Sequence, residues 1–277
     1  MAEPLLSVED LHVAAMDEGG SRPVLRGISF AVGRERVALV GESGSGKSMT
    51  ARAILGLLPR GLRRTGGRVV LGGTDLAGLD ARAWQGLRGK AVGLVLQDPK
   101  FSLNPAHRVG RQVEETLLLH TRLSRTERRE RALDMLAKVG LDDPLRVYRS
   151  YPGELSGGMG QRVMIAAMLI AEPALLIADE PTSALDQAVR GQILDLLRGL
   201  AEERGMGLLL ISHDLQQVAS FAHRVLVMHR GAIVDRLAAE QLADATHPYT
   251  RALWQARPSA ATHGTRLPTA AWQEAAR

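Results

Sequence analysis

The sequence predicts an α/β fold built on a mostly parallel sheet, and three observations support this prediction. The chain has 277 residues, of which 45% are hydrophobic and 23% are charged, as is typical of a folded globular protein. Short apolar runs of strand length recur along it, and helix-like segments separate them, which indicates a parallel sheet covered on both faces. The strands are expected at residues 36–40, 92–96, 175–178, 208–211 and 225–228.

Helices and one hairpin are expected between these strands. Residues 68–73 are flanked by Gly66-Gly67 and Thr74-Asp75, a pattern typical of a hairpin, which indicates a small antiparallel β subdomain. The core helices are expected at residues 47–58, 158–171, 187–203 and 215–221. The first of them should stop at Pro59, because proline cannot continue a helix.

Residues 98–155 differ in character from the rest, and we interpret them as a helical subdomain inserted into the core. Helical patterns occupy residues 109–120 and 126–139, the second rich in Arg and Glu, and four prolines interrupt the stretch. The core then comprises residues 1–97 and 156–245. Residues 246–277 are expected to form a short C-terminal tail.

Composition excludes several function classes. The chain has no cysteine, which excludes a disulfide scaffold, a thiol nucleophile, thiolate zinc sites and cysteine-held iron–sulfur clusters. Lys and Arg exceed Asp and Glu only slightly, by 35 to 30, and aromatic residues are 3% of the chain, which argues against stacking on single-stranded nucleic acid, so we expect no nucleic-acid partner. The longest apolar run, 163–171, is roughly half of a membrane span, and residues 1–10 lack a secretory signal. A cytoplasmic compartment is expected.

Residues 41–48, Gly-Glu-Ser-Gly-Ser-Gly-Lys-Ser, match the phosphate-loop pattern G-x-x-x-x-G-K-[ST] between a predicted strand and a predicted helix. Glycines let backbone N–H groups surround phosphate oxygens, Lys47 reaches the outer phosphates, and Ser48 offers a hydroxyl to Mg²⁺. A glycine-rich turn is the alternative, but the flanking elements disfavour it. A serine-hydrolase elbow is excluded because Ser45 stands where that motif needs glycine. The residues expected to bind nucleotide are Gly41, Ser43, Gly44, Ser45, Gly46, Lys47, Ser48 and Met49.

Two carboxylates end the apolar strand at 175–178. Ligands of open α/β sheets lie at the carboxyl ends of strands, and successive strand residues point to opposite sides, so Asp179 and Glu180 should act differently. We expect Asp179 to serve Mg²⁺ beside Ser48, and Glu180 to orient and polarise the attacking water. A helix cap at a strand end is the alternative for this acidic pair.

A second anion site is predicted at Ser156-Gly157-Gly158, where serine and paired glycines begin a helix. The chain therefore carries two phosphate-binding surfaces, at Lys47 and at Ser156. If they do not face each other in one subunit, two subunits pair head to tail, with each nucleotide between the loop of one and the Ser156 turn of the other.

With these motifs the chain resembles the ATP-binding cassette (ABC) family over nearly its whole length. Residues 156–158 resemble its signature, Gln97 its Q-loop glutamine, residues 183–186 its D-loop, and His213 its switch histidine. The resemblance implies a RecA-like P-loop NTPase core that hydrolyses ATP. It implies that Gln97 contacts Mg²⁺ and the water, that His213 holds the γ-phosphate, and that Asp186 bridges to the partner subunit.

Other cassette classes do not fit this chain. Only 109 residues separate Lys47 from Ser156, too few for the coiled coil of chromosome-organising relatives, and excision-repair relatives need cysteine. A stand-alone transporter ATPase remains, bound peripherally at the cytoplasmic face of the inner membrane, with the helical subdomain docked on membrane subunits. The implied partners are a second ATPase subunit, two permease subunits and an extracytoplasmic solute-binding protein.

Narrower features resemble the peptide, opine and nickel importers. These are Tyr151-Pro152, Met159, residues 163–166 and the tail motif at 247–250. Met159 resembles the subunit type whose partner carries glutamine there, which favours a heterodimer. The absence of cysteine and the run at 58–67 favour the nickel-importer D-type subunit, with nickel or a metal–chelator complex as solute.

A dipeptide or oligopeptide importer is the alternative to nickel. An exporter or regulatory ABC ATPase and a soluble nucleotide switch are further alternatives. The chain also departs from the family near residues 12–16, which lack the aromatic that usually stacks on adenine, so the base is expected either to rest on Met16 or Val24 or to bind weakly.

Overall fold

The computed structural model describes residues 3–17, 20–183 and 185–257. It contains two compact units. Unit 1 comprises Met1–Leu6 and Val70–Leu208, and unit 2 comprises Ser7–Val69 and Leu209–Arg277. Residues 258–277 of the expected tail and Ala184 of the expected D-loop lie outside the described residues.

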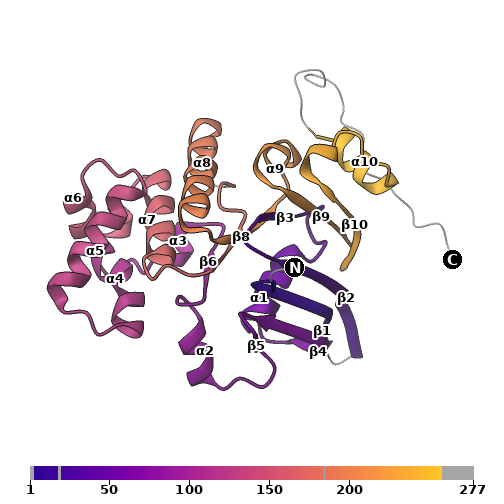
Figure 1. The fold of residues 1–277 in the computed structure, drawn as a ribbon, viewed down its shortest axis with the longest axis horizontal. Helices are drawn as coiled ribbons and strands as arrows, with labels where there is room; N and C mark the ends of the chain where they lie inside the picture. The colour runs from indigo at the N-terminus through magenta and orange to yellow at the C-terminus, as the bar shows by residue number, and fades with distance from the viewer. Residues whose placement is uncertain (1–2, 18–19, 184, 258–277) are drawn as a thin grey trace. The chain divides into compact units, whose positions relative to one another are not determined.

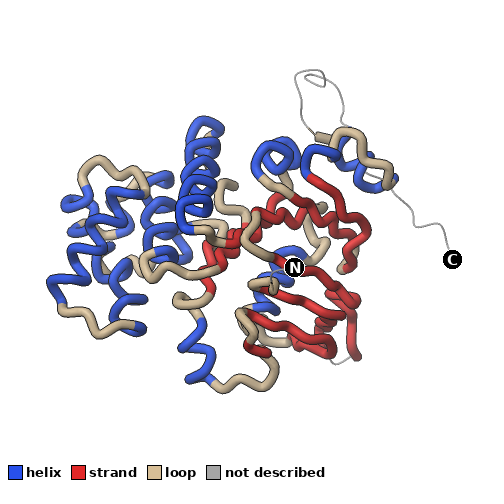
Figure 2. The backbone as a smooth tube through the Cα atoms, viewed as in Figure 1, coloured by secondary structure: helices blue, strands red, loops and turns tan. Residues whose placement is uncertain are grey.

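Unit 2 contains parts of two sheets. In one, strands β1 (Leu6–Asp17), β2 (Gly20–Val32) and β4 (Leu62–Leu71) lie in the order β2-β1-β4, as Figures 1 and 2 show. In the other, β3 (Arg36–Val40) pairs in parallel with β9 (Arg224–His229), and β9 pairs antiparallel with β10 (Ala232–Ala238). Strand β8 (Gly207–Ser212) lies beside β3. Helices α1 (Lys47–Ile54), α9 (Leu215–Phe221) and α10 (Pro248–Gln255), with the 3-10 turn Ala239–Gln241, complete the unit.

Unit 1 joins a parallel strand pair to a group of helices. Strand β6 (Val92–Val95) pairs with β7 (Leu175–Asp179), and every residue of β7 is buried. The expected hairpin is present, because β4 pairs antiparallel with β5 (Thr74–Asp75). The helices are α2 (Ala81–Leu87), α3 (Pro99–Ser102), α4 (Val109–His120), α5 (Arg125–Lys138), α6 (Pro144–Arg149), α7 (Gly157–Leu169) and α8 (Gln187–Arg204), with a 3-10 turn at Pro152–Glu154.

Helices α4 to α7 lie beside one another (Figure 1), where α4 and α5 each bury one apolar stripe and α7 is buried over most of its length. On α4 the buried residues Val109, Val113 and Leu117 recur every four positions. Helix α5 begins with a full capping box, in which Ser124 and Glu127 satisfy each other's backbone N–H groups. The helical character expected for residues 98–155 is therefore confirmed.

Two expected helix ends are wrong for a local reason. The helix expected to run to residue 58 ends at Ile54, because Gly56 adopts a left-handed conformation (φ 63°). The helix expected to run to residue 171 ends at Leu169, and Glu172 beyond it is likewise left-handed (φ 56°).

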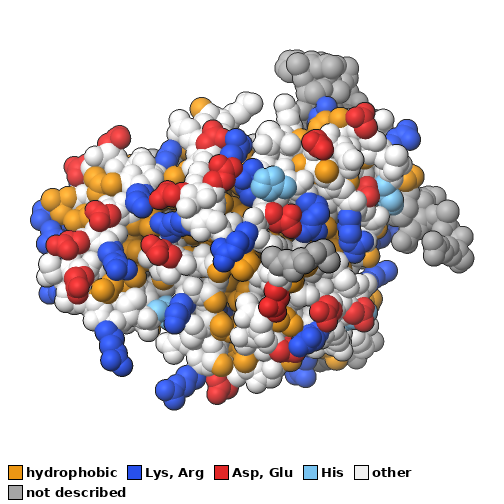
Figure 3. Space-filling model, viewed as in Figure 1, with side chains coloured by type: hydrophobic (Ala, Val, Ile, Leu, Met, Phe, Trp, Pro, Cys, Tyr) orange, Lys and Arg blue, Asp and Glu red, His pale blue; other side chains and the backbone are white. Residues whose placement is uncertain are grey.

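Charge is mixed over the surface. On the face shown in Figure 3, basic and acidic side chains are interspersed, which agrees with a formal net charge of only +5. Across the described residues, no helix combines the length and the apolar character needed to cross a membrane.

Candidate nucleotide-binding site

The phosphate loop of unit 2 is the turn between β3 and α1. Strand β3 ends at Val40, and Gly44 (φ 80°) and Gly46 (φ 107°) take left-handed conformations that glycine adopts without strain. A Cβ on Gly46 would lie 2.9 Å from Leu25 Cδ2, and a Cβ on Gly41 would overlap the backbone oxygen of Met228. Close packing thus requires glycine at position 41, and the left-handed backbone favours it at positions 44 and 46.

Lys47 lies over this loop. Its side chain is 6% exposed, and Nζ donates hydrogen bonds to the carbonyl oxygens of Gly41 (2.8 Å) and Glu42 (2.9 Å). Helix α1 has no side-chain cap and no acidic residue in its first turn, so no side chain competes for its first N–H groups. The buried Ser45 Oγ has no hydrogen-bond partner among the described residues. A loop with these donors fits a phosphate group.

The remaining predicted residues lie on the same turn and on the helix that follows it. Ser43 and Gly44 are exposed at the tip of the turn, while Ser48 and Met49 are half-buried in the first turn of α1. The structure therefore brings the eight predicted residues into one strand–turn–helix segment.

Residues far along the sequence hold this loop, and sequence reasoning did not identify them. The backbone N–H of Gly231, after β9, donates to Ser45 O (2.9 Å), and Thr50 Oγ1 lies 3.9 Å from Met228 Sδ. Tyr249 of α10 is fully buried with its ring 4.3 Å from that of His229. Burial raises the pKa of Tyr249 to about 12, so the phenol stays neutral beside the loop. The sequence signal that could have pointed to Tyr249 is the tail motif at residues 247–250, which contains it.

Unit 1 brings Gln97 and Glu180 together. Gln97 Nε2 donates to Glu180 Oε2 at 3.4 Å, and the buried Asp179 is the last residue of β7. Glu180 is left-handed (φ 47°), a conformation that costs about 1–3 kcal/mol in a residue other than glycine. Its carbonyl accepts hydrogen bonds from Ser183 N (3.2 Å) and Ser183 Oγ (3.1 Å), which hold the turn. Strain supported by local bonds is typical of a functional position.

Ser156 and Asp186 both act as helix caps. Ser156 Oγ accepts from Met159 N (3.3 Å) at the start of α7, and its hydroxyl proton remains available to donate to an anion. Asp186 Oδ1 accepts from Val189 N (3.0 Å) at the start of α8. A Cβ on Gly158 would lie 3.2 Å from Val189 Cγ1, so a larger residue there would press on the side chain of Val189. Gly157 is the first residue of α7.

His213 and the expected adenine contacts lie in unit 2. His213 is exposed directly after β8, and the following Asp214 caps α9 by accepting from Gln216 N and Gln217 N (both 3.1 Å). Met16, at the end of β1, is 46% exposed, and Val24 on β2 is half-buried.

Three magnesium ligands were predicted, of which Ser48 lies in unit 2 and Gln97 and Asp179 lie in unit 1. That the three residues bind one Mg²⁺ stays a prediction. The chemistry of the set fits the ion, because hydroxyl, amide and carboxylate oxygens are the hard ligands that Mg²⁺ prefers. Within the described ranges, no group of three His, Cys, Asp or Glu residues could hold a metal by itself.

Replacing Gly41 with alanine should destabilise unit 2 by about 1–3 kcal/mol, because the new Cβ would overlap the Met228 backbone. Urea unfolding measures the change in the free energy of unfolding. Gly33→Ala is the control, since no atom lies within 4 Å of its Cβ position. Equal stability of the two variants would contradict the close packing described for the loop.

A protein-family model described as "ABC transporter" matches residues 25–183, more than half of the chain. The chain belongs to the ABC transporter family. The expected enzyme class, an ATPase of this family, is thereby confirmed, and so is the expected α/β fold. The dimeric cassette MJ0796, bound to ADP and Pi, superposes with a TM-score of 0.76 at 29% identity, covering 84% of this chain and 98% of that one. The structure of cbiO1 from Clostridium perfringens gives 0.75 at 25% identity, covering 92% and 96%.

Similar sequences are named for peptide-related transport. The peptidoglycan transport ATP-binding protein YejF of Agrobacterium fabrum is 47% identical over 92% of this chain, which spans only 47% of that protein. The probable peptide ABC transporter ATP-binding protein y4tR of Sinorhizobium fredii is 45% identical over 93% of this chain and 78% of its own length. OppD of Bacillus subtilis, an oligopeptide transport ATP-binding protein, is 41% identical over 94% and 74%. The expected nickel-importer subtype is not supported by these relatives.

Proposed function

We propose that this ABC protein hydrolyses ATP to energise an importer of peptides. The phosphate loop carries this proposal, because its buried lysine, its uncapped helix and its orphaned serine hydroxyl together form a cradle for phosphate oxygens. Gln97 and Glu180 supply a polar pair for the attacking water. The division into a core (1–97 and 156–245), a helical subdomain (98–155) and a tail (246–277) is part of the proposal.

In the proposed reaction each residue has a separate task. Lys47 and the loop N–H groups hold the phosphates, and His213 contacts the γ-phosphate. Glu180 accepts a hydrogen bond from the water and polarises it, while Gln97 positions that water. Ser48, Gln97 and Asp179 would hold Mg²⁺, which would supply positive charge to the phosphate oxygens.

The second phosphate surface supports assembly into a pair of ATPase subunits. Ser156, Gly157 and Gly158 begin α7 with no acidic residue in its first turn, so the turn can accept an anion. We propose that a partner subunit's nucleotide contacts this turn and that Asp186 lies at the same interface. Met159 resembles the methionine of the ATPase subunit type whose partner carries glutamine at the same position, which favours a heterodimer.

We propose that the transported solute is a peptide. This proposal replaces the prediction of nickel or a metal–chelator complex. The names of YejF, y4tR and OppD concern peptidoglycan, peptides and oligopeptides, and identity is 41–47% over nearly the whole chain. The absence of cysteine, which favoured nickel, is weaker support than this agreement. Two permease subunits, a solute-binding protein and peripheral attachment at the cytoplasmic membrane face complete the proposed assembly.

The proposal is tested by ATP hydrolysis in the complex reconstituted with its permeases and binding protein. Oligopeptides should raise the rate of phosphate release, whereas nickel–chelator complexes should leave it at the basal level. A rate that rises with nickel complexes and not with peptides would reject the peptide reading. It would leave the ATPase assignment intact.

A further inference from the structure

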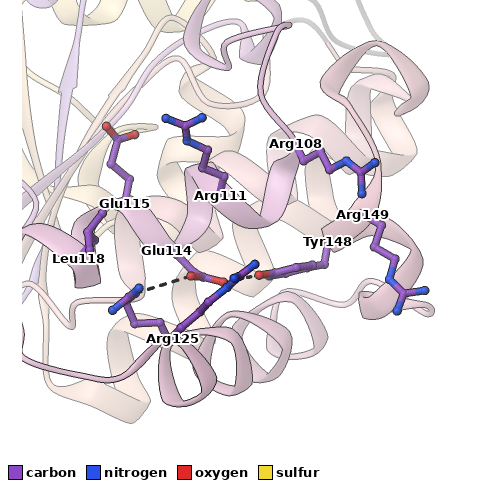
Figure 4. Close-up of a pocket in the computed structure, with 9 residues that line it drawn as sticks. Arg108, Arg111, Glu114, Glu115, Leu118, Arg125, Tyr148 and Arg149 are labelled. Atoms are coloured by element: carbon purple, nitrogen blue, oxygen red, sulfur yellow. Dashed lines mark hydrogen bonds and ion pairs between the residues drawn. The ribbon is translucent and has the colours of Figure 1, made fainter.

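A cavity of about 390 Å³ lies between helices α4, α5 and α6 of unit 1, separate from every residue assigned to nucleotide. Charged side chains line most of it (Figure 4). Five are arginines, namely Arg108, Arg111, Arg125, Arg128 and Arg149, and two are glutamates, Glu114 and Glu115. Five positive minus two negative charges leave an excess of three positive charges around one small space.

One of the two glutamates is already satisfied within the protein. The Tyr148 hydroxyl donates a short hydrogen bond to Glu114 Oε1, and Arg128 Nε lies 3.6 Å from Glu114 Oε2 (Figure 4). Burial, followed by the bond to Glu114, raises the pKa of Tyr148 to about 12, so the phenol remains a neutral donor. Glu114 therefore offsets Arg128, and Glu115 is the one remaining negative charge of the lining against its other four arginines.

Three of those arginines have no anionic partner among the residues that the structure describes. Within the described part of the chain, Arg111, Arg125 and Arg149 make no ion pair with any carboxylate within 4.0 Å. Arg108 stacks over the Tyr151 ring, with 5.6 Å from Cζ to the centroid. Arg128 donates from Nη1 to Leu123 O (2.6 Å), while its buried Nε faces Glu114 at 3.6 Å, beyond hydrogen-bond distance. Like charges around a cavity repel one another, and a buried donor without an acceptor costs free energy.

We propose that this cavity binds a small anion through its phosphate group. A phosphate would accept forked hydrogen bonds from the guanidinium groups and offset their mutual repulsion. The volume lies within the range of small-molecule sites, which is roughly 300–1,000 Å³. The phosphate belongs either to a soluble phosphoanion or to a phospholipid headgroup, and the site chemistry is the same for both. This inference does not depend on the peptide importer proposed above.

The test uses the full chain with Lys47→Ala, which removes the competing phosphate loop. Pyrophosphate is titrated by calorimetry, and flotation with phosphatidylglycerol or phosphatidylcholine vesicles is measured in parallel. The pocket variant is Arg125→Gln with Arg149→Gln. The matched control is Arg122→Gln with Arg131→Gln, which removes two exposed charges of the same region that do not line the cavity. Thermal melting checks that each variant is folded.

Pyrophosphate affinity should fall by about tenfold or more in the pocket variant and by less than about twofold in the control. That result establishes a soluble phosphoanion as ligand. Loss of phosphatidylglycerol flotation in the pocket variant alone, without pyrophosphate binding, establishes the headgroup as the source. Binding of neither probe, or equal losses in the pocket and control variants, would overturn the proposal.

Discussion

Replacing Glu180 with glutamine should lower the rate of ATP hydrolysis by about 10²–10⁴-fold while bound ATP is retained. Glutamine keeps the size of the side chain and can still meet Gln97, now 3.4 Å away, but it cannot accept a proton or polarise water as a carboxylate does. Phosphate release measures turnover, and filter retention of labelled ATP measures binding. The expected pattern is a loss in kcat with affinity preserved.

Glu172→Gln is a matched control for this variant. Glu172 is also a left-handed glutamate (φ 56°) and ends the helix before β7, but it is exposed and takes no part in the site. Its substitution should leave turnover unchanged. Normal turnover in Glu180→Gln would contradict the assignment of Glu180 as the residue that activates water.

Replacing Lys47 with alanine should weaken ATP binding by about 10–150-fold, because a charged hydrogen-bond donor contributes roughly 1.5–3 kcal/mol. Turnover should fall with it, since the same ammonium stabilises charge on the outer phosphates. Lys47 Nζ also bonds the Gly41 and Glu42 carbonyls, so part of the loss reflects a looser loop. Equilibrium binding of a fluorescent ATP analogue measures the affinity.

The control for Lys47→Ala is Lys90→Ala, which removes an equal charge from an exposed position. Thermal melting of both variants separates a folding defect from a binding defect. Unchanged affinity in Lys47→Ala, with the protein folded, would show that the loop does not hold the phosphates.

Local sequence signals were sufficient for the elements that carry the phosphate loop and the carboxylates. The runs at 37–40 and 175–178 are continuously apolar, so their identity as buried strands did not depend on distant contacts. The 109–120 helix was placed correctly because its buried residues repeat at helical spacing. The glycines at 41 and 46 were likewise assigned from the sequence, since they are the two fixed glycines of the phosphate-loop pattern.

Other features depend on contacts that the sequence does not display. Strand β10 was not predicted because most of its residues are only half-buried, which gives no apolar run. Met228, Gly231 and Tyr249 lie nearly two hundred residues beyond the loop that they support, and only the tertiary fold brings them to it. The nickel reading failed because solute choice leaves no chemical trace in these residues and rested on analogy.

ATP-driven accumulation of a labelled oligopeptide in proteoliposomes, with this chain as an ATPase subunit, tests the central claim most directly. Wild type and Glu172→Gln should accumulate the peptide only when ATP is supplied, and Glu180→Gln in this chain should abolish accumulation. Accumulation that continues unchanged in Glu180→Gln, or that never requires ATP, would contradict the claim that this chain energises peptide import.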